Sequence, residues 1–137
     1  MSSAHKNLSV YNTDGIIDIS EKTFAIIVAE WNEEITGALY QGVLETLLKH
    51  GAQKENIIKV NVPGSYELSY GSQVYAAKDE VDAVIALGCV IQGETKHNDY
   101  INNAVAQGLT AVSLKYNKPV VFGVLTPNTH QQALDRA

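Results

Sequence analysis

The sequence lacks the features that mark disulfide-linked, metal-binding or membrane-spanning proteins. Its one cysteine, Cys89, cannot form a disulfide within the chain, and no metal-ligand spacing surrounds it. No segment approaches the roughly eighteen apolar residues that a membrane helix needs, and the first residues lead into no apolar signal-peptide region. We therefore expect a cytoplasmic protein without a membrane partner.

Dense positive charge is also missing. The chain carries 10 Lys and Arg against 15 Asp and Glu, a formal charge of −5. Nucleic acids and anionic membranes select for Lys/Arg patches, so we expect no nucleic-acid partner. Internal repeats and low-complexity linkers are absent as well. The 137 residues, of which 45% are hydrophobic, suffice for one domain with a core but not for two.

Apolar runs and helical periodicity alternate four times along the chain. The predicted strands cover residues 24–29, 57–62, 83–87 and 120–125. The predicted helices run from the residues after Trp31 to His50, from 65 to about 79, from 95 to 117, and from 126–129 towards Ala137. Strands without polar alternation are typical of a parallel sheet covered on both faces. We expect a flavodoxin-like three-layer sandwich with a four-stranded parallel sheet.

Residues 1–22 differ from the remainder because their apolar positions are too scattered to form a core. We interpret them as an N-terminal arm, or as a strand that seeks a partner, and residues 23–137 as the domain. Polar and aromatic residues gather where the predicted strands end, at Trp31, 65–67, 89–97 and 122–126. Because the carboxyl ends of parallel strands face one crevice, this edge is the expected ligand site.

Four blocks in this order resemble the lumazine synthase family. They are Trp31-Asn32, the segment from Pro63 to Leu68, the segment Gly88-Cys89-Val90-Ile91-Gln92-Gly93-Glu94-Thr95-Lys96-His97, and 119–126 with Gln132-Ala133 and Arg136. The resemblance implies condensation of 5-amino-6-(D-ribitylamino)uracil with 3,4-dihydroxy-2-butanone 4-phosphate to 6,7-dimethyl-8-ribityllumazine, the penultimate step of riboflavin biosynthesis. It implies a transferase without a metal or organic cofactor.

The resemblance also implies an assembly. Family members form homopentamers, decamers or icosahedral sixty-subunit shells, with active sites shared between neighbouring subunits, and riboflavin synthase is a candidate partner. The arm at 1–22 would pair with a neighbour's sheet. A Gly/Lys-rich segment and a final helix, carrying a second phosphate-binding lysine, would follow beyond Ala137, so we expect the C-terminal helix to be incomplete.

His97 resembles the family's acid/base histidine. An imidazole titrates near neutrality and can both donate and accept the protons of such a condensation. The alternative is a buried structural histidine, because His97 lies four residues before Ile101 on the stripe that is predicted to pack inward.

Glu94, Thr95 and Arg136 resemble the family's phosphate-binding residues, with the arginine contributed across a subunit interface. Glu94 is negative, so its contact should come from its backbone N–H. An ordinary helix cap at 94–95 and a solvated arginine are the structural alternatives. Gln92 departs from the family, because many members carry arginine or lysine there.

The remaining site residues resemble the family's pyrimidine and ribityl contacts. They are Trp31, Ser65, Tyr66, Glu67, Cys89, Val90, Ile91 and Phe122. Trp31 would stack on the heterocycle, with core packing as its alternative. Phe122 would come from a neighbouring subunit, although a phenylalanine inside a strand is more often core. Ser65 and Glu67 would hold the sugar alcohol, or else cap a helix, and Val90 and Ile91 would offer backbone hydrogen bonds.

Two rival functions remain open at this stage. A lumazine- or flavin-binding relative would keep the pocket but lack turnover, and the presence of His97 argues against it. A shell-forming protein would use assembly more than catalysis. Without the family resemblance, the residues support only a domain that binds a small anion at its sheet edge.

Overall fold

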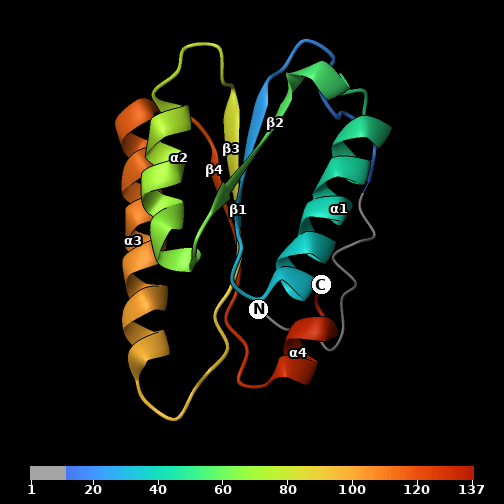
Figure 1. Ribbon diagram of the computed structural model, residues 1–137. Helices are drawn as coiled ribbons and strands as arrows, with labels where there is room; N and C mark the ends of the chain where they lie inside the picture. The colour runs from blue at the N-terminus through green and yellow to red at the C-terminus, as the bar shows by residue number, and fades with distance from the viewer. Residues whose placement is uncertain (1–11) are drawn as a thin grey trace.

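The computed structural model describes residues 12–137, which form a parallel sheet between two layers of helices (Figure 1). The strands are β1 (Phe24–Ala29), β2 (Ile57–Val62), β3 (Ala83–Cys89) and β4 (Val120–Leu125). The helices are α1 (Glu33–Lys49), α2 (Leu68–Ala76), α3 (His97–Tyr116) and α4 (His130–Leu134), with short 3₁₀ turns η1 (Lys54–Asn56) and η2 (Ser65–Glu67). The predicted three-layer α/β fold is confirmed.

The strand order is β2-β1-β3-β4, and every pairing is parallel. β3 lies inside the sheet between β1 and β4, which explains its uninterrupted apolar sequence. It runs to Cys89, two residues past the predicted end at Leu87, because Gly88 and Cys89 still pair with Val124 and Leu125 of β4. The apparent break at Gly88 is therefore not the end of the strand.

Both faces of the sheet are buried. α2 and α3 cover one face and α1 and α4 the other, as Figure 1 shows. Neighbouring residues of β1 serve opposite layers, since Ile27 belongs to the cluster with Leu68 and Leu109, whereas Ile26 packs with Leu39 of α1. Ile26 and Ile27 are 0% exposed, and full burial of such a side chain contributes roughly 1.5–3 kcal/mol. The layers thereby fix where each strand ends.

The helix ends follow local rules. Gly51 follows the C-cap residue of α1 with a φ of 98°, a conformation that glycine adopts without strain. The Thr129 hydroxyl accepts the Gln132 N–H at 3.2 Å and caps α4. α4 ends at Leu134, so it is shorter than the helix that we expected to reach Ala137.

The N-terminal arm is described only in part. Residues 1–11 of the predicted arm lie outside the described residues, and residues 12–22 form no helix or strand. No helix in the described part of the chain combines the length and the apolar character needed to cross a membrane. The first regular element of the described residues is β1.

Candidate active site

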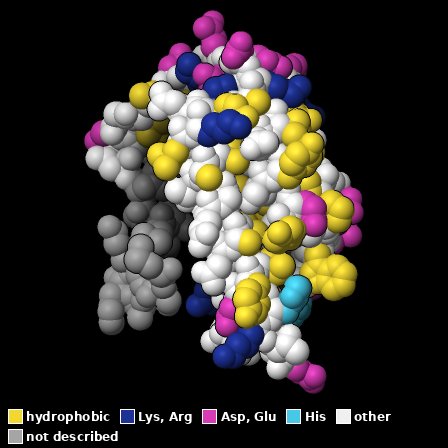
Figure 2. All heavy atoms as spheres, turned by 90° about the vertical axis from the view of Figure 1, so that its left-hand side faces the viewer, with side chains coloured by type: hydrophobic (Ala, Val, Ile, Leu, Met, Phe, Trp, Pro, Cys, Tyr) yellow, Lys and Arg dark blue, Asp and Glu magenta, His cyan; other side chains and the backbone are white. Residues whose placement is uncertain are grey.

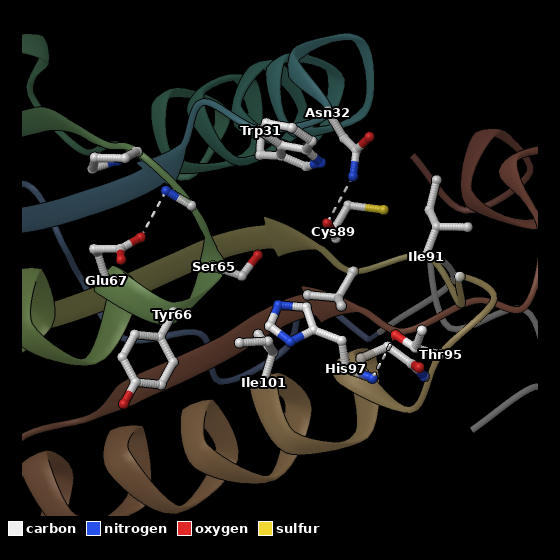
Figure 3. A pocket seen from close by; sticks show the side chains of 15 residues that line it. Trp31, Asn32, Ser65, Tyr66, Glu67, Cys89, Ile91, Thr95, His97 and Ile101 are labelled. Carbon is white, nitrogen blue, oxygen red and sulfur yellow. Dashed lines mark hydrogen bonds between the residues drawn. The ribbon is translucent and has the colours of Figure 1, made fainter.

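A pocket of about 610 Å³ opens at the carboxyl end of the sheet, where β1, β2 and β3 deliver their following loops (Figure 3). It is lined by nine of the residues singled out in the sequence: Trp31, Ser65, Tyr66, Glu67, Cys89, Val90, Ile91, Thr95 and His97. These residues come from three separate segments of the chain. The predicted gathering of polar and aromatic groups at strand ends is thus observed for three of its four segments, whereas residues 122–126 do not line the pocket.

Trp31 forms one wall of the pocket. Its side chain is 73% exposed, so the alternative that this tryptophan is core is wrong. The chain leaves β1 through hydrogen bonds from the Glu30 N–H to the Val62 carbonyl (2.8 Å) and from the Trp31 N–H to the Pro63 carbonyl (3.2 Å). The backbone of Trp31 is therefore held against the end of β2, and its indole is left over the pocket (Figure 3).

Ser65 and Glu67 form a second wall. Ser65 is 6% exposed, and its hydroxyl has no hydrogen-bond partner among the described residues although it borders the pocket. Ser65 does not cap the following helix, because Gly64 occupies the N-cap position and its N–H donates to Glu67 Oε2 at 2.9 Å. The alternative of a cap at Ser65 is wrong, and the buried hydroxyl has no hydrogen-bond partner among the described residues.

Gly88 makes this wall possible. A Cβ atom at Gly88 would meet the Ser65 Oγ at 2.5 Å and the Leu68 Cδ1 at 2.9 Å. These separations are shorter than non-bonded contacts allow, so only glycine permits Ser65 to lie directly against β3. β3 and the wall that contains Ser65 are therefore in close contact at Gly88.

The segment 89–92 forms the floor of the pocket. The Val90 N–H donates to the Leu125 carbonyl at 2.9 Å, and the Gln92 N–H donates to the Pro127 carbonyl at 3.0 Å. Because peptide groups alternate in direction along an extended chain, those of Cys89 and Ile91 face the opposite side, toward Trp31. The Cys89 carbonyl accepts a hydrogen bond there from Asn32 Nδ2 at 2.9 Å. The Ile91 N–H has no backbone partner within residues 12–137.

The thiol of Cys89 is buried, with the residue only 1% exposed. Burial raises the pKa of this thiol above its ordinary value, because the thiolate would lose its hydration. Cys89 is consequently held as a neutral thiol beside the pocket, and it contributes packing and a backbone carbonyl rather than a nucleophile.

His97 is the first residue of α3 and is exposed at the pocket. Figure 3 shows its ring entering from the start of α3, whereas the Trp31 indole enters from the turn between β1 and α1. The ring makes no hydrogen bond or ion pair within the described residues, and it is not in the core. The alternative of a buried structural histidine is therefore wrong, and both ring nitrogens can meet a ligand.

The first backbone N–H groups of α3 have no strong capping partner among the described residues. Lys96 is the N-cap residue and makes no side-chain cap bond, and the Thr95 hydroxyl meets the His97 N–H at a long 3.4 Å. The expected threonine cap is thus displaced by one residue and weak. Gly93 and Thr95 line the pocket, but Glu94 does not. A helix N-terminus without a cap favours an anion such as phosphate.

Two predicted residues lie away from this pocket. Phe122 is in the middle of β4, opposite Ala86, and is 45% exposed, so it is neither past a strand end nor packed in the core. Arg136 follows α4, where its Nη1 donates to the Gln132 carbonyl at 2.8 Å. Neither residue lines the pocket of its own chain.

The pocket also contains residues that were not among the predicted site residues. They are Asn32, Pro63, Gly64, Gly93, Asn98 and Ile101. Asn32 had a usable signal, since an asparagine directly after a strand tolerates a left-handed backbone and begins many helices. Ile101 was taken only as part of the inward stripe of α3. In the described part of the chain, no group of three His, Cys, Asp or Glu could hold a metal ion.

Comparison with known proteins identifies the family of this chain. Residues 21–137 match the family model described as 6,7-dimethyl-8-ribityllumazine synthase. A protein of that name from Cytophaga hutchinsonii is 62% identical over the whole chain, which covers 86% of that relative. Relatives of the same name from Parabacteroides distasonis and Phocaeicola vulgatus are 48% and 44% identical over the whole chain, which covers 86% and 82% of them. The chain therefore belongs to the 6,7-dimethyl-8-ribityllumazine synthase family.

Proposed function

We propose that the pocket between Trp31, Ser65 and His97 is where this enzyme condenses 5-amino-6-(D-ribitylamino)uracil with 3,4-dihydroxy-2-butanone 4-phosphate. The products are 6,7-dimethyl-8-ribityllumazine, phosphate and water. The observation that carries the assignment is the family match over residues 21–137, together with one pocket that is lined by three of the four segments that resemble the family. A volume of about 610 Å³ is in the range of small-molecule sites.

The pyrimidine would lie between the Trp31 indole and the floor at 89–91. A flat heterocycle stacks favourably on an exposed indole. The Ile91 N–H faces this side and is not used by the sheet, so it can donate to a carbonyl oxygen of the uracil. Val90 cannot donate here, because its N–H is taken by the Leu125 carbonyl. Of the backbone N–H groups of Val90 and Ile91, only that of Ile91 is therefore expected to donate to the pyrimidine.

The ribityl chain would lie along Ser65 and Glu67. The unpartnered Ser65 hydroxyl can accept or donate a hydrogen bond to a sugar-alcohol hydroxyl. Glu67 uses Oε2 for the Gly64 N–H, and its other carboxylate oxygen can accept from the ribityl chain. Tyr66, which is exposed beside them, would cover the chain from the solvent side.

His97 would move the protons of the reaction. Imine formation, loss of phosphate and ring closure each require proton transfer, and the imidazole is exposed to the pocket with no partner among the described residues. The phosphate would bind the uncapped N–H groups that begin at Gly93 and Thr95, next to this ring. Glu94 would contribute its backbone N–H, since its carboxylate would repel the phosphate.

The rest of the site, a second aromatic ring and the phosphate-binding arginine, would come from a second copy of the chain. Phe122 and Arg136 do not line the pocket of their own chain, and a neighbouring subunit would supply them in a homopentamer. Large apolar side chains of α2 and α3 are exposed as well, including Tyr70, Val74 and Leu114. Figure 2 shows hydrophobic groups along the face that carries α2 and α3. Such surface favours burial against another subunit.

We extend the proposal to higher assembly and location. Pentamers could pair as decamers or close into icosahedral shells, with residues 1–22 pairing with a neighbour's sheet and riboflavin synthase as a partner. The single buried thiol of Cys89 is compatible with a reducing, cytoplasmic compartment. Light scattering on the purified chain tests the assembly.

The test of the activity is an optical assay with both substrates, following lumazine absorbance and fluorescence against the uncatalysed reaction. We expect enzyme-dependent product from the native chain. Pyrimidine binding in calorimetry without product formation would replace the proposal by a ligand-binding role. Absence of both would overturn the assignment of the pocket.

A further inference from the structure

Asn32 connects the two sides of the proposed pyrimidine slot. It follows Trp31 directly and has a left-handed backbone, with φ 62° and ψ 48°. Its Nδ2 donates to the Cys89 carbonyl at 2.9 Å, across 57 positions of sequence. Its own carbonyl accepts the N–H groups of Ile35 at 2.9 Å and Thr36 at 3.1 Å. One residue therefore turns the chain, begins α1 and holds two strand ends together.

The hydrogen bond lies where the sheet no longer joins β1 to β3. The last paired residues of these strands are Val28 and Leu87, whereas β3 continues to Cys89 beside β4. Beyond Leu87, the β1 side of β3 has no backbone ladder. The Asn32 amide takes the place of the missing ladder bond, as Figure 3 shows. It fixes the separation between the segment with the indole and the segment with the Ile91 peptide.

We propose that Asn32 is a positioning residue that sets the Trp31 indole against the backbone of 89–91 and so determines the width of the pyrimidine slot. The inference rests on the proposed binding of the pyrimidine in this pocket. Asn32 acts through Trp31 and Cys89, and it needs no contact with the substrate itself. The left-handed backbone and the side-chain amide of Asn32 are both required, because the turn directs the indole and the amide holds the turn in place.

The main test is Asn32→Gly, which permits the left-handed backbone but removes the amide. Asn32→Asp is the second variant, because aspartate tolerates the same conformation but has no N–H donor. The matched control is Asn117→Gly. Asn117 is the other left-handed residue besides glycine among residues 12–137, with φ 50°, and it ends α3 outside the pocket.

Two readouts separate positioning from general stability. We expect Asn32→Gly to raise the KM for the pyrimidine about threefold, less than removal of the indole itself, and to change kcat by less than about twofold, as expected when a binding interaction is weakened. The KM for the phosphate substrate should stay unchanged. Trp31 is the one tryptophan of the chain, so time-resolved anisotropy of its fluorescence reports the motion of this indole alone. We expect greater local motion in both Asn32 variants and native motion in Asn117→Gly.

The outcomes are distinct. If Asn32→Gly keeps native anisotropy and native KM, or merely matches Asn117→Gly, the positioning role is overturned. Anisotropy is measured without substrate, so it tests the hold on the indole even if the native chain forms no lumazine. Greater motion in an inactive native protein would support the positioning role and contradict the proposed function. Native motion of the indole in the Asn32 variants of an active enzyme would contradict the positioning role and support the proposed function.

Discussion

The pocket has two halves that are built in different ways. The half for the pyrimidine and ribityl chain consists of strand ends and a 3₁₀ turn joined by hydrogen bonds, and it contains a buried serine that lies against Gly88. The half for phosphate is an exposed loop, 92–97, in which Gly93 has open space around it. The half proposed for the pyrimidine is therefore held by contacts within one chain, whereas the half proposed for phosphate is open to groups from outside the chain.

The largest expected effect is at His97, which lies where the two halves meet. Its substitution distinguishes a loss of catalysis from a loss of binding. His97→Ala should lower kcat about 100-fold or more, because general acid/base groups typically contribute 10²–10⁴-fold. His130→Ala is the matched control, since His130 is exposed in α4 and pairs with Glu34 at 3.5 Å outside the pocket. Steady-state assays and light scattering would measure turnover and assembly. Equal rates for the two variants would remove His97 from the chemistry.

The next effect tests whether the phosphate half is shared between chains. Arg136→Ala should raise the KM for the phosphate substrate roughly tenfold, because a guanidinium–phosphate contact is charge-assisted. If Arg136 acts across an interface, co-assembly of Arg136→Ala with His97→Ala subunits should restore about a quarter of the sites by random pairing. Activity of the mixture that equals the sum of the separate variants would mean that both residues serve one chain's site.

Substitutions at two glycines test whether the two halves of the pocket differ in rigidity. Gly88→Ala should lower the free energy of unfolding by about 1–3 kcal/mol, because the new methyl group would overlap Ser65 and Leu68. Gly93→Ala should leave stability within about 0.5 kcal/mol, since no atom lies within 4 Å of the position that its new methyl group would take. Denaturant unfolding measures both changes. Similar losses for both glycines would contradict the division into a tight and an open half.

Removal of the indole should have a smaller effect, confined to the pyrimidine half. Trp31→Ala should weaken pyrimidine binding by roughly fivefold, or about 1 kcal/mol, the size of an aromatic stacking interaction. Trp31→Phe retains a flat ring and should restore most of the affinity. Calorimetric titration measures both. An unaltered affinity in Trp31→Ala would show that the indole does not stack on the ring.

Much of the closed half was predictable because it depends on local sequence. A tryptophan between Glu30 and Asn32 directly after an apolar run indicates exposure at a strand end, and the structure confirms it. The structural alternative of a cap at Ser65 is wrong, because Gly64 and Glu67 form the cap instead and the serine is buried against Gly88. Sequence cannot show that approach, since Gly88 is far from Ser65 along the chain.

Other parts of the site depend on contacts that no local pattern contains. The role of Asn32 comes from a carbonyl that lies 57 positions away. Phe122 resembles a core residue in sequence, but β4 lies at the edge of the sheet and leaves it exposed. The strand order decides this, and strand order is set by packing of the whole domain. The roles of Phe122 and Arg136 remain predictions about a second subunit.

The smallest expected effect concerns the thiol within the closed half. Burial raises the pKa of Cys89, so the folded state binds this proton more tightly than the unfolded state does. The resulting stability is full below the thiol's unfolded pKa and is lost as the pH rises through the folded pKa. Denaturant unfolding between neutral and alkaline pH should show this slope, and Cys89→Ala should reduce it. Iodoacetamide should alkylate the native thiol slowly and the unfolded thiol rapidly, whereas fast native labelling would show that this half of the pocket opens.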